Sequence, residues 1–216
     1  TPTATPASGL HIRRAVPADR DALFEICLKT ADSGEDASAL YSEPHLPGYV
    51  WVMPYAELEP DFAFVLADGG RAIGYVVAAA DTAAFERRLE AEWWPGVRRA
   101  IAGVVPSLPF DFTVLERVNT PERHEEWLAV DYPAHLHINI LPQAQAAGWG
   151  WRLIERELDA LRQAGIRGVH LLGGRVQGVI RGEDIEDHLL PEPLGGTVCR
   201  IGRGTWGRRD VRPVAA

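Results

Sequence analysis

The chain has 216 residues, of which 46% are hydrophobic and 24% are charged, and this balance is typical of a globular protein with a large core. It excludes a fibrous or disordered chain. The formal net charge of −8 argues against a nucleic-acid partner, because binding to a phosphate backbone depends on clustered cations.

The sequence contains no signal for a membrane. Residues 1–9, TPTATPASG, have no cationic start and no apolar centre, so we expect a flexible segment and neither a signal peptide nor an anchor. No run approaches the roughly 20 apolar residues that a spanning helix needs. The two cysteines, Cys27 and Cys199, lack metal-ligand spacing and predict a reduced, cytoplasmic protein. We expect one domain over residues 10–216.

The N-terminal third predicts a strand, a helix and a hairpin. Residues 10–15 alternate apolar and polar side chains as a half-buried strand does. Apolar residues recur at helical spacing from residue 23, and Asp32-Ser33-Gly34 ends that helix. Residues 61–67 and 71–80 flank Asp68-Gly69-Gly70 and predict two antiparallel strands.

The segment between residues 35 and 60 is rich in aromatic residues and proline, which interrupt any long helix. Its tyrosines, including Tyr41 and Tyr55, either line a cleft or plug the side of the core, and both interpretations stay open.

Helices and loops are expected in the middle of the chain. Residues 82–91 read as a helix that Trp93-Trp94-Pro95 closes, because proline cannot continue the hydrogen-bond ladder. Residues 97–104 predict a short helix, residues 106–120 a loop, and residues 121–129 one or two helical turns.

The stretch from residue 131 to residue 152 predicts a strand, a turn at Pro142 and a helix whose first turn carries Gly148 and Gly150. The unpaired N–H groups at such a helix start, together with the positive end of the helix dipole, suit a phosphate. The helix ends at residues 163–165, and residues 168–172 form the next strand. This order of elements suggests a mixed sheet with helices on both faces. After Leu172 the character changes, and residues 197–206 are only a weak strand candidate.

The glycine pattern narrows the kind of phosphate site. The three glycines of a dinucleotide fingerprint and the Gly-Lys pair of a P-loop are both missing. Instead, Gln145-Ala-Ala-Gly148-Trp-Gly150 follows Leu141-Pro142. This resembles the Q/R-x-x-G-x-G/A signature of the GCN5-related N-acetyltransferase (GNAT) superfamily.

Further motifs resemble one branch of that superfamily, the bacterial acetyltransferases similar to the C-terminal domain of O-GlcNAcase. The resemblance covers residues 10–172, and its motifs are Tyr41, LPGY at 46–49, Pro54-Tyr55, Leu58-Glu59-Pro60, Gly74-Tyr75, Asp81-Thr82, EWWP at 92–95 and HLHIN at 135–139.

The resemblance implies an α/β (α+β) GNAT fold, with a mixed central sheet of about six to seven strands and helices on both faces. It also implies an acetyl-coenzyme A site along the fourth strand, which parts from its neighbour. By position, the residues that meet pantetheine are Ile138, Ile140 and Leu141, and those that meet pyrophosphate are Gln145, Ala146, Ala147, Gly148, Trp149, Gly150 and Trp151. Small residues in this loop let an anion approach the backbone closely.

Acetyl transfer to an amine needs a group that accepts the amine's proton. His135, His137 and Asn139 alternate, so they share one face of the strand. We predict His137 as the base, directly or through water, with His135 as the second choice. The alternative interpretation of each histidine is a hydrogen-bonded group of the core. A metal site would use the same pair of histidines, but neither Asp131 nor His170 is a convincing third ligand, and we predict no metal.

The sequence departs from the family pattern at several places. Asn139 stands where the branch carries Asp, and Ala147 and Trp151 lie near positions where the branch carries basic residues. Many superfamily members use a C-terminal tyrosine as general acid, whereas Tyr132 is the last tyrosine here. Four explanations of this departure stay open. The thiolate leaves without a protein acid, or another group protonates it. Alternatively, the protein binds the cofactor without transfer, or the coding frame after Leu172 is shifted.

The resemblance predicts an N-acetyltransferase that moves an acetyl group from acetyl-coenzyme A to a primary amine by direct attack in a ternary complex. The acceptor is an unidentified small molecule or peptide. The alternatives are a catalytically weak or inactive pseudo-acetyltransferase that serves as a coenzyme A- or ligand-binding module, and a structural dimerisation domain. The sequence is compatible with a homodimer.

Overall fold

The computed structural model describes residues 9–121, 123, 130, 132–145, 148–172, 188–189 and 196–200. Its centre is a mixed sheet with the strand order β1-β2-β3-β4-β5-β7-β6. The strands are β1 (His11–Arg14), β2 (Ala63–Asp68), β3 (Arg71–Ala79), β4 (Ala134–Ile140), β5 (Gly168–Leu172), β6 (His188–Leu189) and β7 (Gly196–Arg200). Neighbouring strands are antiparallel except for β4 and β5, which are parallel.

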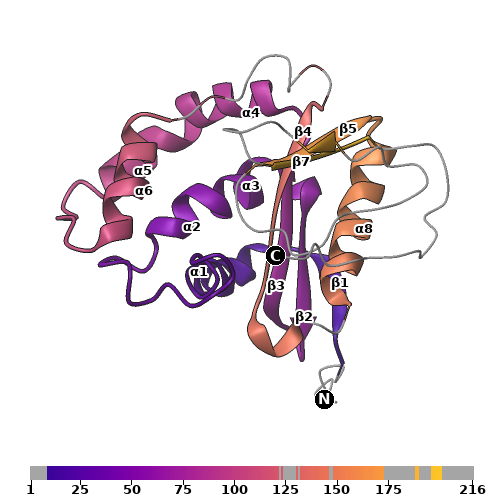
Figure 1. Ribbon diagram of the computed structural model, residues 1–216, viewed down its shortest axis with the longest axis horizontal. Coiled ribbons are helices and arrows are strands. Elements are labelled where there is room, and N and C mark those ends of the chain that lie inside the picture. The colour runs from indigo at the N-terminus through magenta and orange to yellow at the C-terminus, as the bar shows by residue number, and fades with distance from the viewer. Residues whose placement is uncertain are drawn as a thin grey trace, which may run out of the picture.

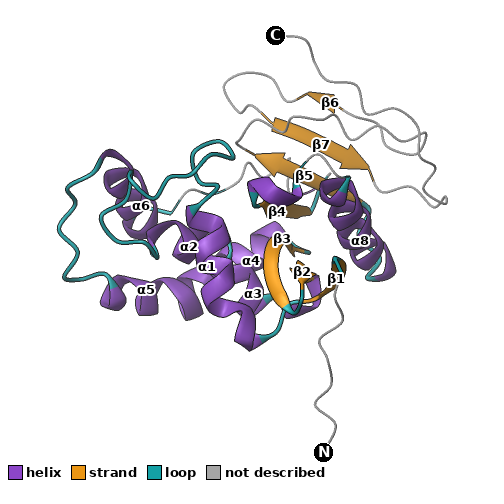
Figure 2. Cartoon of the chain, turned by 90° about the horizontal axis from the view of Figure 1, so that it is seen from below, coloured by secondary structure: helices purple, strands orange, loops and turns teal. Residues whose placement is uncertain are grey.

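Helices cover both faces of this sheet (Figures 1 and 2). On one face α1 packs against β3 and β4, and on the other α8 packs against β2, β3 and β4. The longer helices are α1 (Arg20–Leu28), α2 (Leu46–Trp51), α3 (Met53–Leu58), α4 (Thr82–Arg88), α5 (Trp94–Ala100), α6 (Pro109–Asn119) and α8 (Trp149–Gln163). The short ones are η1 (Pro17–Asp19), η2 (Pro60–Phe62), the π-helical η3 (Leu89–Trp93) and η4 (Pro142–Ala144). The predicted mixed sheet with helices on both faces is confirmed.

The predicted hairpin is the pair β2 and β3, and its turn shows why two glycines stand there. Gly69 and Gly70 have φ angles of +54° and +94°, as a two-residue type I′ turn requires. The strand at residues 10–15 is β1, and the helix from residue 23 is part of α1. Tyr41 and Tyr55 are both 5% exposed, so these two tyrosines plug the core.

The prediction of a loop at residues 106–120 was wrong, because α6 occupies most of it. Pro109 stands in the first turn, where its missing N–H costs nothing. The carboxylate of Asp111 accepts from the backbone N–H groups of Ser107, Leu108 and Ser42 at 2.8–2.9 Å. Burial acts to raise the pKa of Asp111, but these bonds hold it below its ordinary value. A proline followed two residues later by an acid was the missed signal for a helix start.

The prediction that Pro95 closes a helix was also wrong. The chain stays helical from α4 through η3 into α5, and Pro95 lies in the first turn of α5. The π-helical turn shifts the hydrogen-bond ladder just before the proline, so the missing N–H falls where a new helix begins.

Some predictions lie outside the described residues. These are the turns at 121–129, apart from residues 121 and 123, and most of the segment after Leu172. Strand β7 covers the start of the strand predicted at 197–206. Among the residues that the structure describes, no helix is both long and apolar enough to cross a membrane.

Candidate active site

Strand β4 is paired along its length on one side only. Its register with β3 runs from Ala79 opposite His135 to Gly74 opposite Ile140. Its register with β5 holds two pairs, Ala134 with Val169 and His135 with His170. Beyond them β5 continues to pair with β7. The fourth strand of the sheet therefore parts from its neighbour after His135 and leaves an edge at which backbone groups can meet a ligand.

The two faces of β4 differ in chemistry. His135, His137 and Asn139 make hydrogen bonds to tyrosines on the face that α1 covers. On the other face Ile140 meets α8, since a Cβ placed on Gly150 would lie 3.5 Å from Ile140 Cδ1. The predicted division of the strand into a polar and an apolar face is confirmed.

Tyr55 joins the two histidines of the polar face. Its hydroxyl lies 2.8 Å from His135 Nε2 and 3.1 Å from His137 Nε2. Burial raises the pKa of Tyr55 above its ordinary value, so the phenol is neutral near pH 7. Sequence reasoning left open whether Tyr55 lines a cleft or plugs the core, and it missed this contact, because the tyrosine stands 80 residues before His135 and no local spacing links them.

His135 is 5% exposed, and both of its ring nitrogens have hydrogen-bond partners. It therefore matches the alternative of a hydrogen-bonded core histidine. His137 is only half-buried, so it is the better placed of the two to meet a substrate.

Asn139 is held by a second tyrosine. Its Nδ2 donates to the Tyr75 hydroxyl at 2.8 Å, and a side-chain hydrogen bond joins Tyr75 to Cys27. Burial raises the pKa of Cys27 to about 12 and that of Tyr75 well above its ordinary value. Asn139, Tyr75 and Cys27 are therefore neutral near pH 7. Their hydrogen bonds orient the side chain of Asn139 without adding a charge to the polar face of β4.

The predicted phosphate loop leads into a helix start that suits an anion. Gly148 is the N-cap of α8 with φ of +76°, a conformation that glycine adopts without strain. The first ladder bond runs from Arg152 N to Gly148 O, and no described side chain caps this end. The N–H groups in the first turn of this 15-residue helix therefore lie at the positive end of its dipole.

Gln145 is exposed, and its side chain bonds to the backbone of the preceding strand. Its Nε2 donates to Ile140 O at 2.8 Å and its backbone N–H donates to Pro142 O at 3.2 Å. These bonds close the turn between β4 and α8, so Gln145 shapes the loop. Ala146 and Ala147 lie outside the described residues.

Trp149, Gly150 and Trp151 form the first turn of α8 and are half-buried. The guanidinium of Arg152 stacks on Trp149, with its carbon 4.5 Å from the ring centroid. Arg152 thus supplies a cation beside the helix start, although positions 147 and 151 themselves are not basic.

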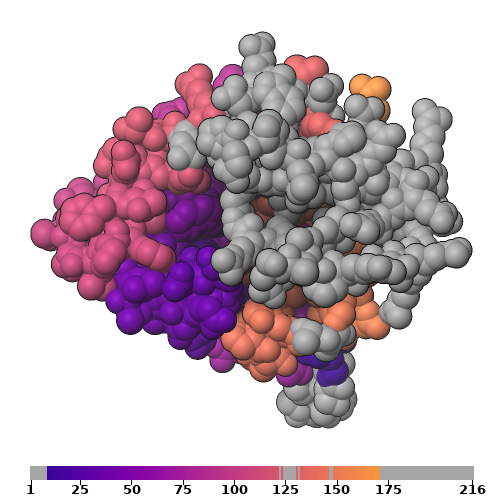
Figure 3. All heavy atoms as spheres, in the orientation of Figure 1, coloured from indigo at the N-terminus to yellow at the C-terminus, as the bar shows by residue number. Residues whose placement is uncertain are grey.

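A pocket of about 420 Å³ lies between α1, the start of β3 and the segment after β4. Figure 3 shows the indigo surface of α1 beside the salmon surface of that segment. The charged lining residues are Glu25, Asp36, Lys29 and Arg71. Glu25 forms ion pairs with Lys29 and Arg71, so these four side chains add no net charge near the loop.

The structure gives no support for a metal site among the described residues. The ring of His170 lies 5.6 Å from that of His135, centroid to centroid, but no group of three or more His, Cys, Asp or Glu in the described part of the chain could hold a metal ion. Asp131, the other third ligand considered, is outside the described residues.

Comparison with known proteins places this site in a family, although no family model matches the chain. The crystal structure of SsHAT is 31% identical, with 90% of this chain and 99% of that chain covered and a TM-score of 0.72. A structure described only as an acetyltransferase is 15% identical over 89% of this chain and 98% of its own, with a TM-score of 0.55.

The sheet with its parted fourth strand and the glycine-started helix define an acetyltransferase fold, and the second likeness supports this fold alone. Because the likeness to SsHAT spans nearly the whole of both chains, this protein belongs to the GNAT superfamily of N-acetyltransferases. The predictions of the fold and of the enzyme class are confirmed, and acetyl-coenzyme A is the co-substrate of that class.

Proposed function

We propose that this protein transfers the acetyl group of acetyl-coenzyme A to a primary amine by direct attack within a ternary complex. The observation that carries the proposal is the construction of β4. One edge of the strand is open beyond His135 and leads to the glycine that begins α8, while one face of the same strand carries His137. A cofactor laid along that edge brings its thioester to the face that holds the histidine.

The cofactor follows the strand and the loop in this proposal. The backbone at Ile138, Ile140 and Leu141 meets pantetheine, where β5 no longer pairs. The pyrophosphate lies over the start of α8, at the positive end of the helix dipole. Gln145 holds the turn that leads to this helix.

The chemistry follows from these positions. A neutral amine attacks the thioester carbonyl, a C–N bond forms, and the tetrahedral intermediate collapses with cleavage of the C–S bond. His137 takes the proton that the amine nitrogen releases, directly or through water. The thiolate leaves and is protonated by solvent.

Several finer points belong to the same proposal. We place the protein in the O-GlcNAcase-like branch, on the motifs between residues 41 and 139. We also propose one domain over residues 10–216, a cytoplasmic setting, compatibility with a homodimer, and a small amine or a peptide as acceptor.

Calorimetry with acetyl-coenzyme A tests cofactor binding first, and absence of heat at millimolar cofactor ends the proposal. Release of free thiol is then followed with lysine, glutamate, spermidine, glucosamine and a lysine-containing peptide as acceptors. We expect His137→Ala to lower kcat by about 10²- to 10⁴-fold, the usual contribution of a general base. His11→Ala is the matched control, because His11 is an exposed histidine at the start of β1.

The alternative is a ligand-binding module without turnover. The neutral Asn139, which is fixed to Tyr75, and the lack of any tyrosine after Tyr132 favour it. Binding of acetyl-coenzyme A without thiol release from any of the five amines would select this alternative.

A further inference from the structure

We propose that Tyr55 is a positioning residue that fixes the tautomer of His137, so that Nδ1 of this imidazole accepts the proton of the amine. The inference deepens the proposed transfer function and rests on it. It follows from a chain of hydrogen bonds whose direction can be assigned from one end to the other.

The chain is anchored at the carbonyl of Pro133. A carbonyl oxygen only accepts hydrogen bonds, and the Thr82 hydroxyl lies 2.8 Å from it, so the single hydroxyl proton of Thr82 points at Pro133. His135 Nδ1 lies 2.7 Å from the same hydroxyl oxygen. Since that oxygen has no second proton to give, His135 Nδ1 must carry the hydrogen and donate.

The same reasoning assigns the donor of the next two hydrogen bonds, which lead to His137. With a proton on Nδ1, neutral His135 has its lone pair on Nε2, so the Tyr55 hydroxyl donates to it across 2.8 Å. The Tyr55 oxygen accordingly accepts from His137 Nε2, 3.1 Å away. His137 therefore carries its hydrogen on Nε2, and the lone pair of the neutral ring is on Nδ1.

This arrangement resists reversal. Turning the chain round would remove the Thr82 proton from the Pro133 carbonyl and set two oxygen lone pairs against each other at 2.8 Å. When Nδ1 takes a proton, the Tyr55 oxygen still accepts from Nε2–H of the imidazolium, so the hydrogen bond becomes charge-assisted without any movement.

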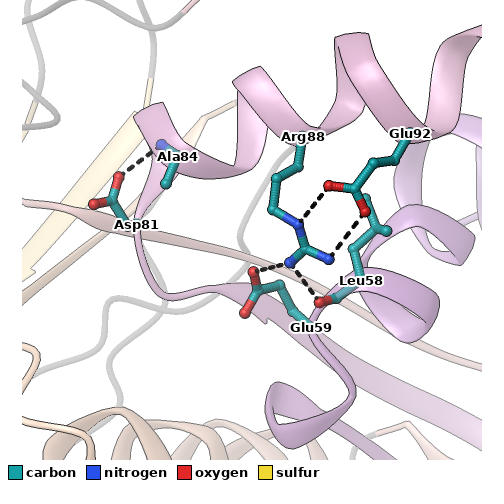
Figure 4. Close-up of polar contacts among 6 residues, drawn as sticks. All are labelled: Leu58, Glu59, Asp81, Ala84, Arg88 and Glu92. Carbon is teal, nitrogen blue, oxygen red and sulfur yellow. Dashed lines mark hydrogen bonds and ion pairs between the residues drawn. The ribbon is translucent and has the colours of Figure 1, made fainter.

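The two hydroxyl groups of the chain sit on helices that Arg88 ties together. Tyr55 lies on α3 and Thr82 begins α4. Figure 4 shows Arg88 of α4 bonded to Leu58 O at 2.8 Å and Glu59 Oε1 at 3.1 Å, at the end of α3, and to Glu92. Asp81 caps the start of α4 through Ala84 N at 2.8 Å. These contacts hold α3 and α4 together, and with them the hydroxyl groups of Tyr55 and Thr82.

The tautomers can be read directly by ¹⁵N NMR of protein labelled in its histidine rings, with His137 assigned from the spectrum of His137→Gln. We expect the Nδ1–H form for His135 and the Nε2–H form for His137. An Nδ1–H form of His137 overturns the proposal. In Tyr55→Phe we expect His137 to become a mixture of both forms, whereas Tyr41→Phe, a matched change at another buried tyrosine, leaves it unchanged.

Kinetics separates a positioning role from a structural one. With the fastest of the five amines, we expect Tyr55→Phe to lower kcat by about 10- to 100-fold and to leave KM for acetyl-coenzyme A within about twofold. A kcat equal to that of Tyr41→Phe overturns the positioning role.

Thr82 gives an independent variant if Tyr55→Phe does not fold. Thr82→Val removes the hydroxyl that anchors the chain and is expected to mix the tautomers of both histidines, while Thr82→Ser restores them. Unmixed tautomers in Thr82→Val contradict the assigned direction. If the wild-type protein transfers acetyl to none of the amines, the proposed function fails and the positioning role with it, whereas the tautomers remain measurable and separate the two failures.

Discussion

The two faces of β4 contrast in what holds them. On the polar face, His137 and Asn139 are held at set positions by hydrogen bonds to the hydroxyl groups of Tyr55 and Tyr75. On the apolar face, Leu136 and Ile140 are 3% and 9% exposed and pack without polar contacts. Adjacent residues of a strand point to opposite sides, so one strand separates the groups of the proposed transfer chemistry from those that stabilise the fold. Substitutions on the two faces should therefore have different consequences.

The largest effect on stability is expected from Leu136→Ala. The truncation leaves a cavity in the apolar face, and the free energy of unfolding should fall by about 3 kcal/mol. Urea denaturation followed by tryptophan fluorescence measures this change. The tautomer of His137 should stay the same in the folded variant, and a changed tautomer would show that the two faces are not independent.

Glu157 lies on α8, the helix that covers the apolar side of the sheet, and a substitution there tests that side. Its side chain is 0% exposed on α8, and neither carboxyl oxygen has a hydrogen-bond partner among the described residues. Burial raises its pKa well above the ordinary value, against the opposing effect of Arg156 and Arg14. We expect Glu157→Met to stabilise the protein by about 2 kcal/mol at pH 7, because a buried polar group without partners is replaced by an apolar one.

The same carboxyl predicts a dependence on pH. Above the unfolded pKa, about 4.3, the folded state binds more protons than the unfolded state, so stability falls as pH rises towards the folded pKa. The advantage of Glu157→Met should accordingly grow from pH 4 to pH 7 in urea titrations. An advantage that shrinks over this range would show that Glu157 is ionised and stabilised in the folded protein.

Tyr75→Phe should have a smaller effect on stability, about 1.5 kcal/mol, because Asn139 Nδ2 and Cys27 lose their partner in the interior. The His137 tautomer should not change, since Tyr75 lies outside the series of hydrogen bonds that runs from Pro133 to His137. A loss larger than that of Leu136→Ala would mean that the polar face also carries the fold.

The smallest effect is expected at the helix start, where two glycines provide a matched pair. Gly148→Ala places a side chain at φ of +76° and should cost about 1 kcal/mol. Gly150→Ala puts its methyl 3.5 Å from Ile140, an ordinary contact, and should be neutral or slightly stabilising. Thermal melts compare the two. Calorimetry with acetyl-coenzyme A should show weaker binding only for Gly148→Ala, and equal affinities would remove the conformational role of this glycine.

Much of the fold could be predicted from local pattern. The hairpin, β4 and α8 each follow from periodicity and from glycines that allow a turn or a helix end. The helix α6 was missed because Pro106 and Pro109 suggested a loop, whereas Pro109 begins the helix and Asp111 caps it. In the candidate site, alternation along the strand predicted that His135, His137 and Asn139 share one face. It did not predict the tyrosines and the threonine that bond to them.

The sequence by itself determined which side chains of β4 share a face, because alternation follows from the geometry of any strand. It also determined that a glycine begins α8, a residue that accepts the positive φ found at Gly148. Only the tertiary structure decided where β5 leaves β4 and which hydroxyls meet the histidines. Tyr55 and Thr82 reach His135 from 80 and 53 residues away, and contacts at such separations depend on how layers pack, which no local period records.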